Sequence, residues 1–342
     1  MIISSWNVNS IRARILNVQE YLKKFNPDIV LTQEIKTQEE TYPFDDIKKL
    51  KYESYVFGQK SYNGVAILSK KKLDKIEKDI FKDKNKQSRI ITADAKYKSK
   101  TIKIINIYTP NGNPVDTEKY DYKLYWLNSL IKKLNYESYV FGQKSYNGVA
   151  IISKKKLENV RTDLINDKLK QSRIISAEFI IKKRKIQIIN IYTPNGNPVD
   201  TDKYTYKIKW LDDLIKQLKI LAKKNENIIL AGDFNIIPSA EDVYNAKSFE
   251  DDALYRLEIR KKLREIINMG YIDSYIHLNA TKEGYTFWNY MRGAWQKNNG
   301  MRIDHFLISN SLINLLKGVK INKNPRGKTK PSDHTPIEIE LA

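Results

Sequence analysis

Short apolar runs that end in polar residues recur along this chain. Residues 1–8 alternate like a strand and end beside Asn7, and the run DIVLTQ at 28–33 leads directly into Glu34. Between them, apolar residues recur at helical spacing over residues 11–22. A strand–helix–strand unit of this kind normally has parallel strands, which places both strand ends at one edge of a sheet. We therefore expect Asn7 and Glu34 to lie near each other.

A further apolar run, IILAGDFN at 228–235, carries Asp233 and Asn235 at its end. A buried carboxylate without a partner is costly, so packing does not explain these residues. The alternative is an ordinary turn, because Asp, Asn and Gly are common where strands end. Two later strands are predicted at 300–309 and 337–341. The polar residues at predicted strand ends are Asn7, Glu34, Asp233, Asn235, Asp304, Asp333 and His334.

The middle of the chain contains an internal repeat. Residues 51–134 and 135–218 align without a gap at an offset of 84 residues, and about two thirds of the aligned positions are identical. The stretch YESYVFGQKSYNGVAI, for example, occurs at 52–67 and again at 136–151. Each copy predicts four strands followed by a helix. Removing one copy would leave 258 residues, a reasonable size for one domain. We therefore expect a single domain over 1–342 with one copy extruded from it.

The composition points to a polyanionic partner. The 342 residues include 61 Lys and Arg against 40 Asp and Glu, which gives a formal net charge of +21. Such an excess favours nucleic acid or an anionic membrane surface, and a lysine-rich composition that only serves solubility is the alternative. The absence of cysteine excludes disulfides and thiolate metal sites, and three histidines argue against a multi-histidine zinc site. No run is long enough to cross a membrane and no signal segment is visible, so we expect a cytoplasmic protein.

The polar residues at the strand ends suit one kind of chemistry. Magnesium prefers oxygen ligands and often takes only one or two carboxylates, which Glu34 and Asp333 could supply. His334 with Asp304 could form a pair for proton transfer, and the two asparagines could bind a carboxylate or a phosphate oxygen without adding charge. Taken singly, each residue also fits a turn former or a solvated acid. Together they predict metal-assisted hydrolysis of a phosphodiester.

Several motifs, read together, resemble one known family. They are SWNVNSIRAR at 5–14, LTQEIK at 31–36, GVAILSK at 64–70, INIYTPNG in both copies, LAGDFNIIP at 230–238, MRIDHFLIS at 301–309 and PSDHTP at 331–336. They resemble the exonuclease III family, the bacterial class II abasic-site endonucleases of the DNase I-like superfamily, over nearly the whole chain except the extra copy. The resemblance implies an α/β fold, a four-layer sandwich of two mixed sheets flanked by helices, with one extra four-strand-plus-helix segment. It also implies incision of double-stranded DNA 5′ to abasic sites and digestion from 3′ ends, with Mg²⁺ or Mn²⁺ as cofactor.

The resemblance also implies roles for the polar residues at the strand ends. Glu34 matches the principal metal ligand, and Asn7 is its neighbour. Asp233 matches the aspartate assigned to the attacking water or the leaving group, and Asn235 matches a phosphate-binding asparagine. The remaining residues are the pair Asp304 and His334 at the scissile phosphate, with Asp333 beside that pair. Asp233 and His334 both remain candidates for activating the water.

The repeat leaves two candidates at each of three further positions. These are Tyr108 or Tyr192 for the active-site tyrosine, Arg89 or Arg173 for a DNA-contacting arginine, and Lys123 or Lys207 for a lysine on the DNA backbone. We favour the second copy, because Tyr192 leads into the helix and strand that carry Asp233, and because 177–180 reads as a better buried strand than 93–96. The abasic-sugar pocket would be formed by Phe287, Trp288 and Met301, with a tryptophan usual in the family where this chain has Phe287. Core packing is the alternative reading of these aromatics.

Two other functions stay open at this point. A non-catalytic DNA-binding protein would result if the extra copy covers or distorts the site, and magnesium-dependent nicking separates that reading from an enzyme. Another phosphodiesterase of the superfamily, acting on phosphoinositides or sphingomyelin, is the third reading. The basic charge and the aromatic stretch at 287–290 favour DNA. We expect a monomer, and a dimer that swaps the repeat is the alternative.

Overall fold

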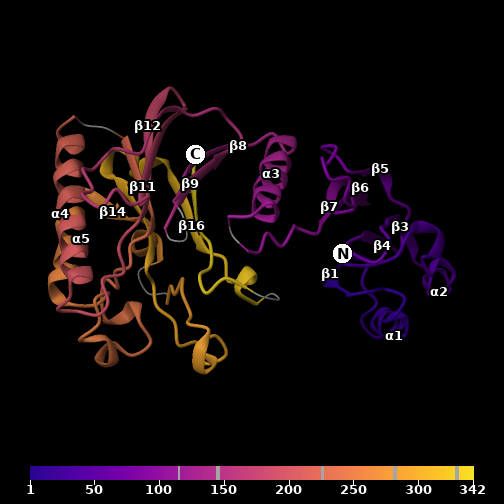
Figure 1. Cartoon of the computed structure of the whole chain (residues 1–342). Helices are drawn as coiled ribbons and strands as arrows, with labels where there is room; N and C mark the ends of the chain where they lie inside the picture. Colours follow the sequence, from indigo (N-terminus) through magenta and orange to yellow (C-terminus); the bar gives the residue numbers. More distant parts are fainter. Residues whose placement is uncertain (115, 144–146, 225–226, 280–282, 328–330) are drawn as a thin grey trace. The chain divides into compact units, whose positions relative to one another are not determined.

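The chain folds into two compact units. The computed structural model describes residues 1–114, 116–143, 147–224, 227–279, 283–327 and 331–342. Unit 1 comprises Met1–Tyr136 and unit 2 comprises Glu137–Ala342, shown in Figure 1 from indigo to yellow along the chain. Unit 1 therefore holds the first fifty residues with copy 1 of the repeat, and unit 2 holds copy 2 with the C-terminal part. We describe each unit by itself.

Unit 1 contains seven described strands and three α-helices. The strands are β1 (Ile3–Asn7), β2 (Ile29–Gln33), β3 (Glu53–Phe57), β4 (Val65–Ser69), β5 (Asp74–Lys78), β6 (Ile90–Tyr97) and β7 (Lys100–Ile107). The helices are α1 (Ile15–Phe25), α2 (Phe44–Lys48) and α3 (Glu118–Lys133), with a 3₁₀ turn at Glu39–Thr41. The sheet order is β1-β2-β4-β3, and β5-β6-β7 form a separate antiparallel sheet.

Strand β4 lies at the centre of unit 1. All five of its residues, VAILS, are buried, as expected for a continuous apolar strand covered on both faces. Ala66 and Leu68 pack in a cluster with residues of α1, α2 and β2. Val65 and Ile67 pack on the opposite face against β6. The sheet that carries β1 and β2 is therefore fixed between a helical layer and the second sheet of this unit.

Unit 2 contains ten described strands and three α-helices. The strands are β8 (Glu137–Phe141), β9 (Val149–Ser153), β10 (Glu158–Arg161), β11 (Ile174–Ile181), β12 (Arg184–Tyr192), β13 (Asn227–Asp233), β14 (Tyr271–Asp273), β15 (Asp304–Ser309), β16 (Leu316–Ile321) and β17 (Ile337–Leu341). The helices are α4 (Asp202–Lys223), α5 (Leu257–Asn268) and α6 (Ser274–Asn279). Short 3₁₀ turns are η2 (Ala240–Asp242), η3 (Ala246–Phe249), η4 (Met291–Gly293), η5 (Asn310–Leu315) and η6 (Asn324–Gly327).

A six-stranded mixed sheet, in the order β10-β11-β12-β13-β15-β14, is the framework of unit 2. Helices α4 and α5 lie side by side and share a core cluster with this sheet (Figure 1). The buried stripe of α4 includes Trp210, Leu214 and Leu218, which recur at helical spacing. The two-stranded sheets β8-β9 and β16-β17 pack with other sheet residues in clusters of their own. Strand β13 is thus buried in the middle of the sheet and brings its C-terminal end to the site.

The predicted α/β fold with mixed sheets is confirmed. Two details of the sequence prediction are wrong: each copy has five described strands before its helix, because β5 and β10 were missed, and α1 begins at Ile15 after a turn rather than at residue 11, where the helical spacing starts. Both missed strands are short and mainly exposed, so they lack an apolar signal. The stacking of sheets into four layers and the single domain with an extruded copy stay predictions. In the structure, β4 of copy 1 pairs with β2, whereas β12 of copy 2 pairs with β13.

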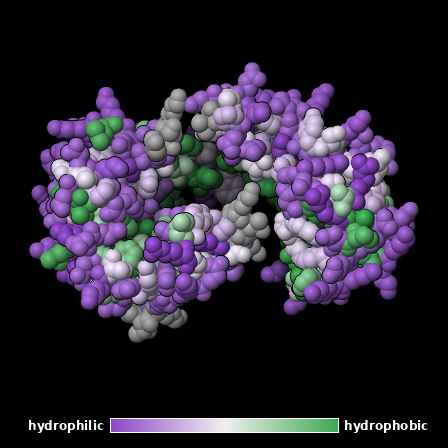
Figure 2. All heavy atoms as spheres, turned by 60° about the horizontal axis from the view of Figure 1, so that its bottom comes forward, coloured by the Kyte–Doolittle hydropathy of each residue, from purple (hydrophilic) through white to green (hydrophobic). Residues whose placement is uncertain are grey.

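The face drawn in Figure 2 is mainly hydrophilic in both units, with hydrophobic residues in smaller groups. Within the described ranges, no helix is both long enough and apolar enough to span a membrane.

Candidate active site

Three neighbouring strands of unit 2 place three of the predicted residues in one row. Tyr192, the last residue of β12, is in register with Asp233 at the end of β13. Asp233 is in turn in register with Asp304 at the start of β15. Residues opposite each other on adjacent strands have side chains about 5 Å apart, so the row concentrates these groups. The prediction that strand ends gather the polar residues therefore holds within this unit.

The turn after β13 fixes the Asp233 carboxylate. Asn235, with a φ of 47°, donates its backbone N–H to Asp233 Oδ1 at 2.9 Å and its side-chain Nδ2 to Oδ2 at 3.2 Å. Asn195, from the copy-2 loop, donates to the Asn235 side chain at 3.3 Å. Gly232 is required here, because a Cβ would lie 2.0 Å from the carbonyl oxygen of Ile191. Asn235 is buried, so its amide orients Asp233 and has little surface left for the predicted phosphate contact.

His334 and Asp304 form the predicted pair. His334 Nδ1 lies 2.9 Å from Asp304 Oδ2, and the ring of Phe287 meets the imidazole edge-on at 4.9 Å. Burial alone would lower the pKa of His334, but the hydrogen bond and charge of Asp304, helped by Asp233 and Asp333, raise it to about 9. At neutral pH the imidazole is therefore protonated and donates to Asp304.

The neighbouring Asp233 holds its proton more tightly than an ordinary carboxyl group. Burial, followed by the negative charge of Asp304, raises the pKa of Asp233 to about 7, and the positive charge of His334 acts in the opposite direction. The protonation of Asp233 therefore depends on the charges of Asp304 and His334. A carboxyl group with a pKa near neutrality can both accept and return a proton, which suits general acid–base chemistry.

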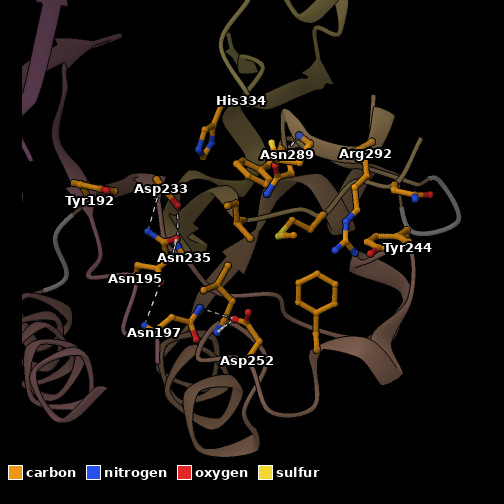
Figure 3. Close-up of a pocket in the computed structure, with 18 residues that line it drawn as sticks. Tyr192, Asn195, Asn197, Asp233, Asn235, Tyr244, Asp252, Asn289, Arg292 and His334 are labelled. Atoms are coloured by element: carbon orange, nitrogen blue, oxygen red, sulfur yellow. Dashed lines mark hydrogen bonds between the residues drawn. The ribbon is translucent and has the colours of Figure 1, made fainter. Parts of the chain in front are cut away.

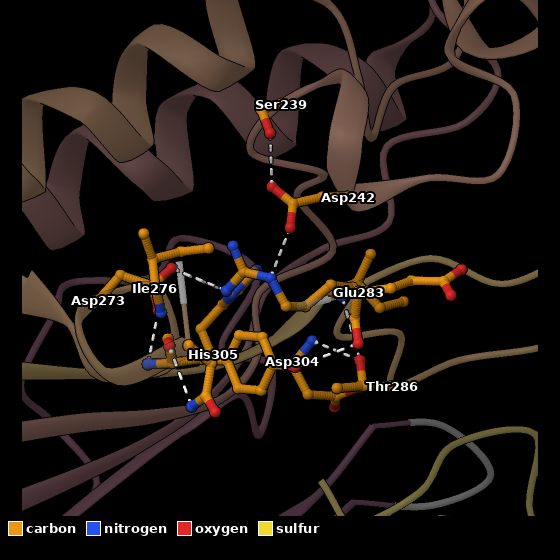
Figure 4. Close-up of polar contacts among 12 residues, drawn as sticks. Ser239, Asp242, Asp273, Ile276, Glu283, Thr286, Asp304 and His305 are labelled. Atoms are coloured by element: carbon orange, nitrogen blue, oxygen red, sulfur yellow. Dashed lines mark hydrogen bonds and ion pairs between the residues drawn. The ribbon is translucent and has the colours of Figure 1, made fainter. Parts of the chain in front are cut away.

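Thr286 connects the two segments that carry the pair. Its Oγ1 accepts the backbone N–H groups of Ile303 and Asp304, both at 3.1 Å, as Figure 4 shows for Asp304. Its carbonyl oxygen accepts the N–H of Thr335, which follows His334, at 2.8 Å. Thr286 is completely buried and was not identified from the sequence. It fixes the backbone of both members of the pair.

A buried ion-pair network lies next to the segment that carries Asp304. Arg302 donates to Asp242 at 2.6 Å and to Asp273 at 2.7 Å, and its Nη1 lies 2.9 Å from His305 Nδ1 (Figure 4). Burial would raise the pKa of Asp273, but the charge of Arg302 outweighs it and the pKa is lowered. Removing one member of such a network is strongly destabilising, because a buried charge is left unpaired. The network joins the loop at 242 and the strand at 273 to the start of β15.

A cavity of about 650 Å³ opens beside the row (Figure 3). Asp233 and His334 line one side, and Phe287 and Met301 lie among the other lining residues. Polar groups from further loops complete the lining, namely Asn195, Asn197, Asp252, Asn289, Arg292 and Asn299. The prediction for Trp288 is wrong: this side chain is completely buried, donates to Asn298 at 3.2 Å and does not line the cavity. Its indole packs in a core with Tyr285 instead.

The copy-2 candidates for DNA contact are anchored inside the protein. Arg173 donates to the carbonyl oxygen of Tyr192 at 3.1 Å and stacks over the tyrosine ring at 4.8 Å. Lys207 is completely buried, and its ammonium donates to the carbonyl oxygens of Asn195, Asn235 and Ala253 at 2.9, 2.6 and 3.0 Å. This burial contradicts the predicted contact of Lys207 with the DNA backbone. The DNA contact of Arg173 stays a prediction.

Unit 1 carries the predicted metal ligand. Glu34 follows β2 directly, and its Oε1 accepts Asn7 Nδ2 at 3.0 Å and the Tyr108 hydroxyl at 2.6 Å. Lys36 lies 3.1 Å from Oε2. Burial would raise the pKa of Glu34, but the hydrogen bonds from Tyr108, Asn7 and Lys36 keep it below its usual range. The expected proximity of Asn7 and Glu34 is therefore confirmed, and Glu34 is ionised at neutral pH.

The donor set fits magnesium more closely than zinc. In the ranges that the structure describes, no three His, Asp or Glu residues gather in a metal-binding group. Magnesium does not need one, because it keeps several waters and takes one or two protein carboxylates plus phosphate oxygens. Glu34 offers such a carboxylate, with Asn7 orienting it. Asp333, the other predicted ligand, lies in unit 2, where its charge contributes to the raised pKa of His334.

The copy-1 candidates repeat the arrangement of copy 2 in part. Arg89 donates to the carbonyl oxygen of Tyr108 at 3.1 Å and stacks over its ring at 4.9 Å, as Arg173 does with Tyr192. Lys123 donates to the carbonyl of Asn111 at 3.2 Å and is only half-buried. Lys123 is therefore still able to meet a phosphate, and the roles of Arg89 and Lys123 stay predictions.

Comparisons with known proteins show which family the chain resembles. The chain matches the Endonuclease/Exonuclease/phosphatase family over residues 4–135 and 106–334. A DNA-(apurinic or apyrimidinic site) endonuclease of Dictyostelium discoideum is 32% identical over 200 residues, 58% of this chain and 53% of that protein. An exodeoxyribonuclease of Bacillus subtilis (strain 168) is 29% identical over 227 residues, 66% of this chain and 81% of that protein. The solved structure of an AP endonuclease from Archaeoglobus fulgidus aligns with 100% of this chain and 99% of that one, at 23% identity and a TM-score of 0.46.

The alignment spans about half the length of the Dictyostelium relative. The two stretches that match the family, in contrast, extend together from residue 4 to residue 334. This chain therefore belongs to the Endonuclease/Exonuclease/phosphatase family.

Proposed function

We propose that this protein is a magnesium-dependent DNA phosphodiesterase of base-excision repair. It would incise double-stranded DNA 5′ to abasic sites and degrade duplex DNA from 3′ ends. The observation that carries the proposal is the cavity of unit 2, which Asp233, His334, Phe287 and Met301 line and where Asp304 holds His334 from behind. Relatives named as an abasic-site endonuclease and an exodeoxyribonuclease support the choice of DNA as substrate. The net charge of +21 suits a polyanionic substrate.

Asp233 and the Asp304–His334 pair have different roles in hydrolysis. Asp233, with a pKa of about 7, accepts a proton from the attacking water as the new bond to phosphorus forms. His334, held protonated by Asp304, hydrogen-bonds a non-bridging phosphate oxygen and offsets the charge that builds there as the bond to the leaving oxygen breaks. The leaving oxygen departs as the 3′-oxyanion and takes a proton from solvent water. Asn235 keeps the Asp233 carboxylate in place. Phe287 and Met301 present apolar surface that suits a sugar without its base.

Glu34, oriented by Asn7, would hold the magnesium ion. The ion would supply charge stabilisation for the phosphate. Its requirement for oxygen ligands agrees with the ionised state of Glu34.

A non-catalytic DNA-binding protein is the second candidate. The observation in its favour is that Glu34 bonds Tyr108 in unit 1, whereas Asp233, Asp304 and His334 belong to unit 2. If the residues of the two units do not act on one phosphate, DNA would bind without being cut.

The test is nicking of a duplex that contains one tetrahydrofuran abasic analogue, with magnesium and with EDTA. The parent should nick only with magnesium, and Asp233→Asn should nick about 10² to 10⁴ times more slowly. The matched variants Tyr192→Phe and Tyr108→Phe compare the two copies. Loss in the first alone would place the working tyrosine in copy 2. An unmodified duplex in the same buffers measures digestion from 3′ ends.

A folded parent that binds the duplex but never nicks it would contradict the enzyme and leave the DNA-binding protein. Nicking that survives both EDTA and Asp233→Asn would contradict the proposed residues.

A further inference from the structure

The two copies of one hairpin have the same sequence and different surroundings. Residues 52–67, which include β3, are identical to residues 136–151, which include β8. The strands that follow, β4 and β9, read VAILS and VAIIS. Elsewhere the copies differ at many positions, for example over 94–97 against 178–181. Any difference in burial between these hairpins therefore comes from their neighbours.

One face of the hairpin is covered in copy 1 and open in copy 2. Val56 is 2% exposed and its counterpart Val140 is 67% exposed. Leu68 is 0% exposed, against 55% for Ile152. The opposite face is covered in both copies, since Ile151 packs in a cluster with β11. The open face of β8-β9 is thus a defined apolar surface rather than a frayed segment.

Copy 1 shows which part of the protein covers this face. Val56 and Leu68 pack against α1, α2 and β2, all within the first fifty residues. Strand β2 pairs antiparallel with β4, with Thr32 opposite Ala66. In the described residues β9 pairs with β8, and no second strand is recorded on its other edge. The position that β2 occupies on copy 1 has no occupant on copy 2 in this part of the structure.

The surroundings of two equivalent glycines, Gly58 and Gly142, show the same difference between the copies. A Cβ at Gly58 would lie 2.4 Å from the carbonyl oxygen of Thr37, so residues 1–50 require glycine there. The counterpart Gly142 has no such constraint, because a Cβ would meet its nearest atom, in Val140, at 3.9 Å. Copy 2 has kept a glycine that its present neighbours do not need.

The side-chain amides of Asn106 and Asn190 also differ in their contacts. Asn106 donates to the carbonyl oxygens of Thr32 at 2.9 Å and Ala66 at 2.8 Å, joining β2 to β4. Its counterpart Asn190 donates to the carbonyl of Ala150 at 2.9 Å. Ala150 corresponds to Ala66, so the half of this contact that belongs to the hairpin is already formed in copy 2.

We propose that the β8-β9 hairpin is a second docking surface for residues 1–50 of this same chain, and that these residues exchange between the two hairpins. The hairpin side chains that receive them are the same, apart from Ile152 in place of Leu68, so the hairpin part of the docking has a similar free energy on either copy. Two contacts beyond the hairpin differ, because Tyr97, which accepts from the Met1 amine, and Lys78, which donates to Glu39, correspond to Ile181 and Thr162. Copy 1 would then serve as the tether. Closing so long a loop adds little cost, because the entropy of closure grows only slowly with length.

The exchange would matter for catalysis, and this consequence rests on the proposed function. Glu34 now accepts the hydroxyl of Tyr108, which follows β7 of copy 1. After docking on copy 2 it would accept the hydroxyl of Tyr192 instead, in the row that contains Asp233. The exchange would thus unite the proposed metal ligand with the acid–base residues. The test below does not measure nicking, so it can fail or succeed independently of the nuclease proposal.

Because the chain has no cysteine, disulfides can report the pairing directly. The full-length triple variant Thr32→Cys, Ala66→Cys, Ala150→Cys gives the thiol at position 32 a choice between two partners. The variant is unfolded, refolded in a thiol–disulfide buffer, digested and analysed by mass spectrometry. Double variants with only one of the two partner positions give the yield of each bond alone.

We expect both bonds within single chains, with 32–150 reaching at least about a tenth of 32–66, the ratio that corresponds to 1.4 kcal/mol. Formation of 32–66 alone would overturn the proposal. Formation of 32–150 only in covalent dimers would overturn it too, because the docked segment would then belong to a second copy.

A second measurement does not depend on disulfide geometry. Val56→Asp places a charge under the copy-1 position of residues 1–50, and Val140→Asp is the matched change on copy 2. With Val56→Asp, hydrogen exchange at the β9 amides should slow at least about tenfold, because docking there adds a paired strand. Val140→Asp should leave β9 exchange at its parental rate or faster. Loss of protection in β2 with no gain in β9 would overturn the proposal.

Discussion

Ile107 at the end of β7 is 38% exposed, whereas its counterpart Ile191 in β12 is 1% exposed. Lys123 donates to one carbonyl oxygen and Lys207 to three. These pairs occupy equivalent positions in the two copies, so local sequence does not set their burial. The C-terminal residues cover the β12 side of copy 2, and residues 1–50 cover the hairpin side of copy 1. Each copy is thus half of a core whose other half is supplied by a flanking segment.

The largest expected difference between the copies concerns the two lysines. Lys207→Met should lower the free energy of unfolding by about 3 kcal/mol, because three carbonyl oxygens, two of them in buried contacts, lose their donor. Lys123→Met should change it by less than about 0.5 kcal/mol. Urea unfolding followed by tryptophan fluorescence measures both. Equal losses would show that the two lysines have the same surroundings in solution.

Alanine substitutions at Gly58 and Gly142 should differ in their free-energy cost, by less than the two lysine variants do. Gly58→Ala should weaken the docking of residues 1–50 on copy 1 by about 2 kcal/mol, because the new Cβ meets the Thr37 carbonyl at 2.4 Å. Gly142→Ala should stay within about 0.5 kcal/mol of the parent. Chemical denaturation monitored at β2 by hydrogen exchange distinguishes local from global effects. A cost at Gly142 as large as at Gly58 would mean that both hairpins are covered.

The pH dependence of nicking should reflect groups that lie beside copy 2 only. Because the pKa of Asp233 is about 7, the rate should fall about tenfold per unit as pH drops below 7 and this group becomes protonated. Because the pKa of His334 is about 9, the rate should fall again above pH 9 as the imidazole loses its proton. Initial rates from pH 5.5 to 10 test both the acidic and the alkaline fall of the pH–rate profile. In Asp304→Asn the alkaline fall in rate should begin at a lower pH. An alkaline fall at the parental pH would contradict the role of this pair.

The smallest predicted effect concerns Thr286. Thr286→Val removes the hydroxyl that accepts two backbone N–H groups, and it should cost about 1 kcal/mol of stability. It should also lower the pKa of His334, because Asp304 loses its fixed position. Thr92→Val in copy 1 is the control, since its buried hydroxyl has no hydrogen-bond partner in the described structure. NMR titration of His334 gives the readout, and identical titration curves for parent and Thr286→Val would exclude a positioning role.

The sequence predicted those parts of the fold that depend on local pattern. The last strand was expected at 337–341 and lies there, and Asn7 was expected beside Glu34 and bonds it. The Asp304–His334 pair was also expected, because a histidine that transfers protons is commonly oriented by a carboxylate. In each case a short apolar run and its polar end carry the information, and the resemblance to a family supplies the role.

Other features depend on contacts that no local pattern reveals. The burial of Lys207 could have been found, because it lies three residues before Trp210 and four before Leu211, on the apolar face of its helix. Thr286 gave no signal, since its partners lie 17 and 18 residues away. The division into units was beyond sequence reasoning for a different reason. Two nearly identical hairpins offer β2 the same kind of partner, so pattern alone cannot rank them.

The pairing of β2 with β4 has a consequence for biosynthesis. Unit 1 is a continuous stretch, so every contact within it can form once the first 136 residues have left the ribosome. Copy 2 follows 84 residues later, which takes about 4 to 17 s at translation rates of 5 to 20 residues per second. Hairpins and helices form within microseconds, long before that interval ends. The order of synthesis therefore gives copy 1 the first opportunity to bind the N-terminal strands, whichever copy binds them more tightly.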